Sequence, residues 1–139
     1  PRDPFHRVDM RRSSRHVRVE RNGELLAESS RAILLFETGL PTRFYLPGED
    51  VVRDLQPSAR QSYCPYKGQA SYWSVEVGGR VHPDLAWSYE DPLQDATPVV
   101  GLIAFYDERV DIVLDGERRA RPRTAVSKAI MDEAGISGE

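Results

Sequence analysis

Residues 16–27, HVRVERNGELLA, decide the fold class of this chain. Polar and apolar residues alternate through its first five positions, which is the period of a strand with one buried face. Asn22 and Gly23 follow, a pair that readily adopts the positive φ angles of a tight two-residue turn. The apolar run 25–27 then supplies a return strand. This stretch therefore predicts an antiparallel β-hairpin.

Strand patterns continue along the rest of the chain. Residues 70–77 are rich in β-branched and aromatic residues and end at two glycines. Residues 109–114 alternate again and end at an Asp-Gly pair. Short apolar runs of similar character occupy residues 32–36, 44–46, 85–89 and 99–106. Together these patterns predict a single small, mostly-β domain of antiparallel strands, with a short helical segment over 48–55.

The chain has the length of one domain, and its composition changes at both ends. Arginines crowd residues 1–15, which we interpret as a solvated basic N-terminal arm. Residues 16–117 form the β-rich domain. Residues 118–139 begin with a second basic segment, after which a threonine can cap a short amphipathic helix over 125–134. The alternative for the two basic ends is contact with nucleic acid.

Charge and cysteine content exclude several classes of function. The net charge of −3 argues against general nucleic-acid binding. No apolar run approaches the roughly 20 residues of a membrane span, and residues 1–15 contain no signal-peptide core. Cys64 is the one cysteine, and the three histidines do not stand at a metal-ligand spacing. We therefore expect a cytoplasmic protein without a metal or cofactor, and without a membrane or nucleic-acid partner.

Several short motifs occur in a specific order: FETGLP (36–41), RFYLP (43–47), YCPYKG (63–68), AWSY (86–89) and AFY (104–106). In this order they resemble the bacterial domain-of-unknown-function family 427, sometimes labelled nucleotidyltransferase-like, from about Val17 to Leu114. The resemblance implies a β-tent or roll-like fold. Relatives in that wider fold group carry a four-cysteine zinc site, which a chain with one cysteine cannot form. The sequence also lacks a glycine-rich phosphate loop and a paired-aspartate metal motif, so it offers no residues for nucleotidyl transfer.

The Cys-Pro-Tyr-Lys-Gly turn at 64–68 is the main candidate site. Its proline restricts the preceding residue to extended backbone, and its glycine releases the chain from the turn. Such a turn can direct Lys67 as a fixed cation toward a carboxylate or phosphate, with Arg43 or Arg60 assisting. The alternative is a salt bridge from Lys67 to Glu37 or Asp50 that holds the turn to the sheet.

Cys64 and Lys67 are also candidate catalytic groups. A nucleophilic thiolate needs a neighbouring cation or histidine, and Lys67 is close in sequence. However, no Cys-His-Asp order accompanies the cysteine, and free cysteines are most often buried and inert. Glu37, Asp50 and Asp107 are candidate acid–base groups; the alternatives are a capping role for the first two and a solvated side chain for Asp107.

The aromatic residues supply candidate walls for a binding pocket. Alternate residues of a strand share a face, so Leu85, Trp87 and Tyr89 are expected to point the same way. Such rings can line a pocket for a planar group or surround a cationic one. Alternatively, they form the core of a small β domain with their polar tips hydrogen-bonded. The candidate ligand-binding residues are Arg43, Tyr45, Asp50, Tyr63, Tyr66, Lys67, Trp87 and Tyr89.

Three functions are compatible with these residues. The first is a small-molecule binding domain for an anionic, ring-containing ligand, for example a nucleotide-like one. In it, Lys67 and an arginine bind the charge, and Trp87 and Tyr89 hold the ring. The second is an enzyme that uses Cys64 or Lys67 as its reactive group. The third is a protein-interaction module that reads a peptide or a modified side chain through the aromatic cluster. We expect the first.

Overall fold

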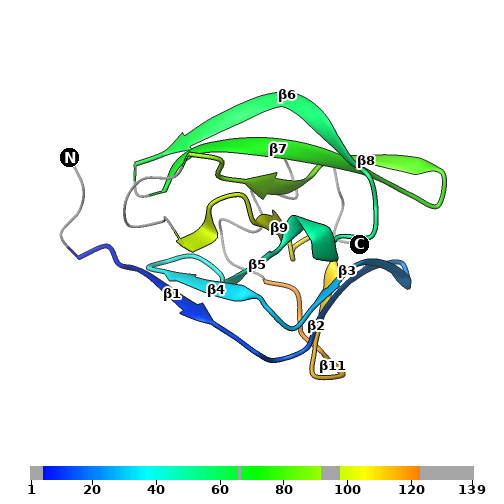
Figure 1. Cartoon of the computed structure of the whole chain (residues 1–139), viewed down its shortest axis with the longest axis horizontal. Helices are drawn as coiled ribbons and strands as arrows, with labels where there is room; N and C mark the ends of the chain where they lie inside the picture. The colour runs from blue at the N-terminus through cyan, green and yellow to red at the C-terminus, as the bar shows by residue number, and fades with distance from the viewer. Residues whose placement is uncertain (1–4, 66, 92–97, 123–139) are drawn as a thin grey trace.

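The computed structural model describes residues 5–65, 67–91 and 98–122 (Figure 1). One sheet is built from β1 (Val8–Arg12), β4 (Ile33–Glu37), β5 (Arg43–Leu46), β6 (Leu55–Cys64), β7 (Gly68–Val77), β8 (Arg80–Ser88) and β9 (Ile103–Phe105). A second sheet is built from β2 (Val17–Arg21), β3 (Glu24–Ser29), β10 (Asp111–Leu114) and β11 (Glu117–Arg118). A 3-10 turn, η1 (Gly48–Asp50), follows β5.

The strands of both sheets pair in antiparallel fashion. The large sheet has the order β1-β4-β5-β9-β8-β7-β6, and the small sheet has the order β11-β10-β2-β3. The predicted mostly-β domain of antiparallel strands is therefore confirmed. In the part of the chain that the structure describes, no helix is long and apolar enough to cross a bilayer.

Three hairpins in the described residues turn on two residues that both have positive φ. Asn22 and Gly23 (φ 51° and 80°) join β2 to β3, which confirms the hairpin predicted at 16–27. The pairs 78–79 and 115–116 join β7 to β8 and β10 to β11 in the same way. Turns of this kind are favoured because their twist matches the right-handed twist of the strands they join.

The large sheet separates two apolar clusters, because neighbouring residues of a strand point to opposite faces. Phe44 and Leu46 of β5 belong to the first cluster, together with Val17, Val19 and other residues of the small sheet. This first cluster is the core that joins the two sheets. Tyr45, which lies between Phe44 and Leu46, belongs to the second cluster. The second cluster lies on the other face of the large sheet and holds the candidate site.

An irregularity in β8 changes which face its aromatic residues occupy. The β7–β8 register shifts between Trp73 and Val75, and Asp84 on the β8 side has a φ of 52°. As a result Leu85 packs in the first cluster, whereas Trp87 packs in the second. The expectation that Leu85 and Trp87 point the same way is wrong, because a bulge breaks the two-residue period of the strand.

The ordered sheet extends beyond the predicted domain limits of 16 and 117. Part of the segment interpreted as a solvated arm forms β1, which pairs with β4 from Val8 opposite Glu37 to Arg12 opposite Ile33. Alternate residues of β1 pack against the second cluster, and its arginines are exposed. This alternation was not recognised in the sequence because arginines dominate the segment. The predicted C-terminal helix at 125–134 lies outside the described residues.

The strand β6 was not predicted. The sequence favoured a helical segment over 48–55, but only η1 is helical there, and Leu55 already begins β6. This edge strand is polar and contains Pro57, near which its register with β7 shifts. Proline and a bulge are features that protect a sheet edge from pairing with other chains. The same features hide the strand from a search for alternating apolar residues.

Candidate functional site

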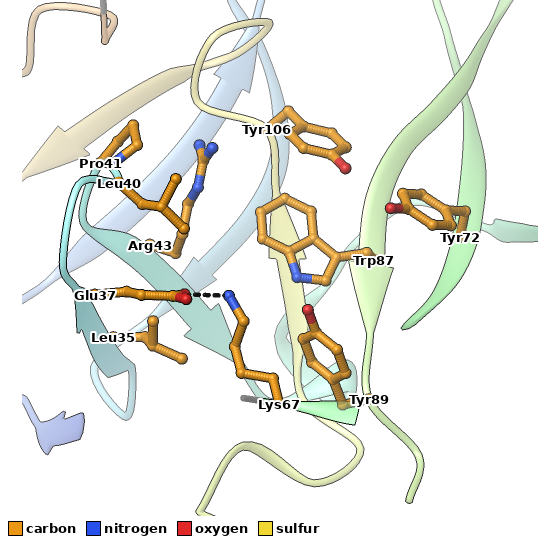
Figure 2. Close-up of a pocket in the computed structure, with 10 residues that line it drawn as sticks. All are labelled: Leu35, Glu37, Leu40, Pro41, Arg43, Lys67, Tyr72, Trp87, Tyr89 and Tyr106. Carbon is orange, nitrogen blue, oxygen red and sulfur yellow. Dashed lines mark hydrogen bonds and ion pairs between the residues drawn. The ribbon is translucent and has the colours of Figure 1, made fainter. Parts of the chain in front are cut away.

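A pocket of about 160 Å³ opens on the second-cluster face of the large sheet (Figure 2). One wall comes from β4, β5 and the loop between them, and the facing wall comes from β7, β8 and the segments after β8 and β9. Lys67, from the β6–β7 turn, stands between the walls at one end (Figure 2). The lining residues are Leu35, Glu37, Leu40, Pro41, Arg43, Lys67, Tyr72, Trp87, Tyr89 and Tyr106.

Trp87 is the centre of the aromatic wall. Its ring lies 4.4 Å from the ring of Tyr106, and its indole N–H donates to the phenol oxygen of Tyr45 at 3.0 Å. The ring of Tyr45 meets the indole edge-on, at 6.0 Å and 89°. Tyr72 lies opposite Trp87 in the β7–β8 register, and its phenol shares a 2.7 Å hydrogen bond with Ser62. These contacts hold the rings in fixed orientations, as a site for a planar group requires.

Three phenols of this region have pKa values above their ordinary range. Burial is the main cause for Tyr45, Tyr89 and Tyr106, and it raises the pKa of each. For Tyr45 the hydrogen bond from Trp87 offsets part of this effect, and for Tyr106 the neighbouring Tyr72 adds to it. All three are therefore neutral phenols near pH 7, able to form hydrogen bonds but not to act as bases.

Arg43 is held in the opposite wall by two adjacent carboxylates. Its Nη1 donates to Asp107 and, at 2.6 Å, to Glu108, while its Nη2 donates to Glu108 at 2.8 Å. The guanidinium carbon also lies 5.4 Å and 5.7 Å from the ring centres of Trp87 and Tyr106. Burial lowers the pKa of Arg43, but the bonds to Glu108 and Asp107 outweigh it, so the net pKa is raised. Arg43 is thus a permanent cation whose charge is already matched.

Asp107 is a carboxylate whose ionised form is disfavoured by burial. Burial raises its pKa above the ordinary range, and the adjacent Glu108 adds to this, although Arg43 acts in the opposite direction. The residue is 6% exposed, so the interpretation of Asp107 as a solvated side chain is wrong. Two carboxylates share one guanidinium here, which leaves one net negative charge at this wall.

Lys67 closes the end of the pocket as part of a second charged group. Its ammonium donates to Oε1 of Glu37, and Nε2 of His6 lies 2.8 Å from Oε2 of the same carboxylate. The side chains of Lys67 and Glu37 are 10% and 2% exposed, so the ion pair is nearly buried. The ammonium also lies 6.0 Å from the ring centre of Tyr89. Of the two salt-bridge partners predicted for Lys67, Glu37 is the one observed.

Lys67 has further hydrogen-bond donors besides the one that Glu37 accepts. An ammonium group carries three N–H donors, and this bond uses one of them. In Figure 2 the ammonium lies in the space between the two walls, with Glu37 on one side and Trp87 and Tyr89 on the other. Lys67 can therefore hold its turn to the sheet and still present a donor to the pocket.

Four predicted ligand-binding residues line the pocket together: Arg43, Lys67, Trp87 and Tyr89. A fifth, Tyr45, lies directly behind Trp87, has no exposed surface and supports the indole through its hydrogen bond. The predicted residues therefore include members of both pocket walls and the lysine that lies between them.

The other predicted residues lie apart from this group. Asp50 is in η1, with its carboxylate 3.4 Å from Arg31. Tyr63 exposes 68% of its surface, and Cys64 is half-buried at the end of β6 but does not line the pocket. Tyr66 lies outside the described residues. Among the residues that the structure describes, no three His, Cys, Asp or Glu side chains gather to hold a metal ion.

Leu35, His6 and Glu108 are among the residues of the site and its surroundings that were not predicted. Leu35 lies within an uninterrupted apolar run, so alternation did not assign it a face. His6 and Glu108 reach their partners across 31 and 65 positions of sequence, respectively. A local sequence pattern cannot reveal pairs of residues that are so far apart in the chain. Glu108 stands next to a predicted strand and His6 in the predicted basic arm, but the sequence does not indicate their partners.

A family model described as a domain of unknown function, DUF427, matches residues 9–116. No curated protein matches the chain. The match begins in β1 and includes every residue that lines the pocket, so it reaches further toward the N-terminus than the motifs predicted. Because the match covers most of its length, the chain belongs to the DUF427 family.

Proposed function

We propose that this protein binds a small molecule that consists of a single aromatic ring with an anionic group. The ring lies against Trp87, and the anionic group accepts a hydrogen bond from Lys67. The observation that carries the proposal is the position of the Lys67 ammonium, at the end of a pocket with an aromatic wall (Figure 2). Ligand sites commonly combine apolar and aromatic walls with a few fixed polar groups of this kind.

The size of the pocket supports a single ring rather than a whole nucleotide. A protein cavity of about 150 Å³ accommodates benzene, and the pocket here has about 160 Å³. The base of a nucleotide-like ligand fits this volume, but its sugar and phosphate groups exceed it. Such groups would have to lie outside the pocket, in solvent.

Burial of the aromatic residues favours a small molecule over a peptide. Trp87, Tyr72 and Tyr89 expose between 5% and 6% of their surface, whereas a peptide-reading surface presents its rings to solvent. The enzyme alternative has less support, because Lys67 in an ion pair has no lone pair for nucleophilic attack. Cys64, the other candidate nucleophile, does not line the pocket.

The two tryptophans provide a matched test. Both indole N–H groups are hydrogen-bonded, Trp87 to Tyr45 at 3.0 Å and Trp73 to Ser88 at 2.9 Å, but only Trp87 lines the pocket. In a ¹H–¹⁵N NMR titration with benzoate and nicotinate, we expect the Trp87 indole resonance to shift and that of Trp73 to stay. The variants Trp73→Phe and Trp87→Phe assign the two resonances. Equal response of both indoles, or of neither at millimolar ligand, would refute the proposal.

The role of Lys67 is tested by removing its charge without leaving Glu37 buried and unmatched. The double variant Lys67→Met with Glu37→Gln removes both charges of the pair, and Lys67→Arg keeps the cation. A hydrogen bond to a charged group contributes about 1.5–3 kcal/mol, so the double variant should bind benzoate about 10- to 100-fold more weakly. Lys67→Arg should retain more of the affinity than the double variant. Undiminished binding by the double variant would remove Lys67 from the site.

A further inference from the structure

The hydroxyl of Tyr89 has no hydrogen-bond partner among the residues that the structure describes, which sets it apart from the other phenols around the pocket. Tyr72 takes part in a hydrogen bond of 2.7 Å and Tyr45 in one of 3.0 Å, while Tyr106 interacts with the neighbouring Tyr72. Tyrosine hydroxyls normally have a partner when the residue is buried, so one without a partner requires an explanation. The Tyr89 hydroxyl is therefore a candidate for contact with a ligand.

This hydroxyl lies at the end of the pocket that also holds Lys67. Tyr89 lines the pocket, is only 5% exposed, and carries its oxygen on the end of the ring nearer to Trp87 (Figure 2). The Lys67 ammonium lies 6.0 Å from the centre of the same ring. Burial raises the pKa of Tyr89, so the hydroxyl keeps its proton near neutral pH and can donate a hydrogen bond. Two donor groups from separate segments of the chain therefore meet at one end of the pocket.

We propose that the anionic group of the ligand is a carboxylate, bound by Lys67 through one oxygen and by the Tyr89 hydroxyl through the other. The inference rests on the proposed function and names its ligand class, the aromatic carboxylates. A carboxylate is planar and accepts hydrogen bonds at both oxygens, so it matches two donors that come from different segments. Tyr89 then determines specificity, because it gives the second oxygen a donor without adding a second positive charge.

The cations around the pocket favour an anion with one charge. Arg43 is already bound by two carboxylates of its own wall. Arg60 lies 4.7 Å from the ring centre of Tyr72 and 3.9 Å from the carboxylate of Asp84. Lys67 is thus the cation that presents a donor at this end. A phosphate group carries nearly two charges near neutral pH and has three acceptor oxygens. Its second charge would be poorly matched in a nearly buried site, which is costly.

A hydroxyl that serves a ligand and not the fold can be recognised from stability. Because no hydrogen bond within the described residues uses the Tyr89 hydroxyl, the ligand-free variant Tyr89→Phe should unfold at the same temperature as the unmodified protein. Tyr45→Phe, in contrast, leaves the buried indole N–H of Trp87 without its acceptor and should unfold at a lower temperature. A lower unfolding temperature for ligand-free Tyr89→Phe would show that its hydroxyl supports the fold, and would overturn the inference.

Titration of the full chain with three single-ring ligands, followed through the Trp87 indole resonance, measures the contact itself. Benzoate has the proposed chemistry, nitrobenzene has its shape without its charge, and phenyl phosphate has a larger and more highly charged group. A hydrogen bond to a charged group is strong, so Tyr89→Phe should bind benzoate about 10- to 100-fold more weakly. Its affinity for nitrobenzene should change much less. The unmodified protein should bind benzoate more tightly than phenyl phosphate.

Tyr63 offers a matched control, because it is 68% exposed and does not line the pocket. The variant Tyr63→Phe loses the same hydroxyl group and should bind benzoate as the unmodified protein does. Undiminished benzoate binding by Tyr89→Phe would overturn the inference and leave the proposed function standing. Equal weakening of benzoate and nitrobenzene, or tighter binding of phenyl phosphate than of benzoate, would do the same. If benzoate leaves the Trp87 resonance of the unmodified protein unmoved, the proposed function itself is rejected, and the inference with it.

Discussion

Asp107 and Glu108 are adjacent carboxylates on one guanidinium, and we predict that their amide variants differ greatly in stability. Glu108 has no exposed surface and accepts hydrogen bonds from both terminal nitrogens of Arg43, at 2.6 Å and 2.8 Å. Asp107 accepts a hydrogen bond from one of these nitrogens. The variant Glu108→Gln should therefore destabilise the fold much more than Asp107→Asn.

The magnitude follows from the bonds that each variant loses. Glu108→Gln replaces an accepting oxygen by an NH₂ group that faces the Arg43 guanidinium, so a charged hydrogen bond is lost and two donors oppose each other. One such bond contributes about 1.5–3 kcal/mol, and a broken buried ion pair costs about 3–5 kcal/mol. Because Arg43 keeps Asp107 as a partner, we expect a loss of about 3 kcal/mol in the free energy of unfolding.

Asp107→Asn has two opposing effects. It weakens one bond to Arg43, but it also removes the net negative charge that this wall buries. The raised pKa of Asp107 means that its ionised form destabilises the folded state, with the penalty appearing as pH rises above the ordinary value of 3.8. We expect a net change within about 1 kcal/mol near neutral pH. Relative to the unmodified protein, Asp107→Asn should become more favourable as pH rises from about 4.

Urea unfolding followed by tryptophan fluorescence measures both variants, with thermal unfolding as a check. For a chain of this size, 1 kcal/mol corresponds to about 3 °C in Tm, so Glu108→Gln should unfold about 10 °C lower. Asp107→Asn should stay within about 3 °C of the unmodified protein. Equal losses in the two variants, or a loss below about 1 kcal/mol for Glu108→Gln, would refute this account of the charged wall.

Two further predictions concern stability away from the pocket. Burial, together with Arg21, Arg109 and Arg80, lowers the pKa of His82, so the folded state resists a proton that the unfolded state accepts. Stability should therefore fall as pH drops below the ordinary value of 6.5, and His82→Gln should reduce that fall in urea unfolding; an identical pH profile in the variant would contradict the assignment. Gly23 has a φ of 80° with open space around it, so Gly23→Ala should cost about 1–2 kcal/mol through backbone strain alone, and unchanged unfolding would show that the turn tolerates a side chain.

Local chemistry explains which parts of the fold were predictable. The hairpin turn at 22–23 and the strand ends at 78–79 and 115–116 were predicted from neighbouring residues, because positive φ angles favour Gly, Asn and Asp. The strands β1 and β6 were missed because the first is rich in arginine and the second is polar and contains proline. Both are edge strands, and an edge strand needs no continuous apolar face to be held in a sheet.

The residues of the candidate site were likewise predicted only in part. Lys67, Trp87 and Tyr89 were predicted because a fixed turn and an aromatic strand are visible in the sequence, and the structure brings them to one pocket. Asp50 and Tyr63 were predicted from the same neighbourhood of sequence, yet they lie elsewhere. Proximity along the chain does not decide proximity in a sheet whose order runs β4-β5-β9-β8-β7.

From the sequence alone, the β character of the chain, the hairpin turn at 22–23 and the residue types available for a binding site were determined. Each of these depends on residues within a few positions of one another. Only the tertiary structure decided which partner each charge has: Glu37 for Lys67, 30 positions away, and Glu108 for Arg43, 65 positions away. It also decided that Trp87 faces the pocket and Leu85 the core between the sheets. The physical reason is that the order of the strands and the position of a bulge determine the neighbours of a side chain. Neither can be read from the alternation of apolar and polar residues along one strand.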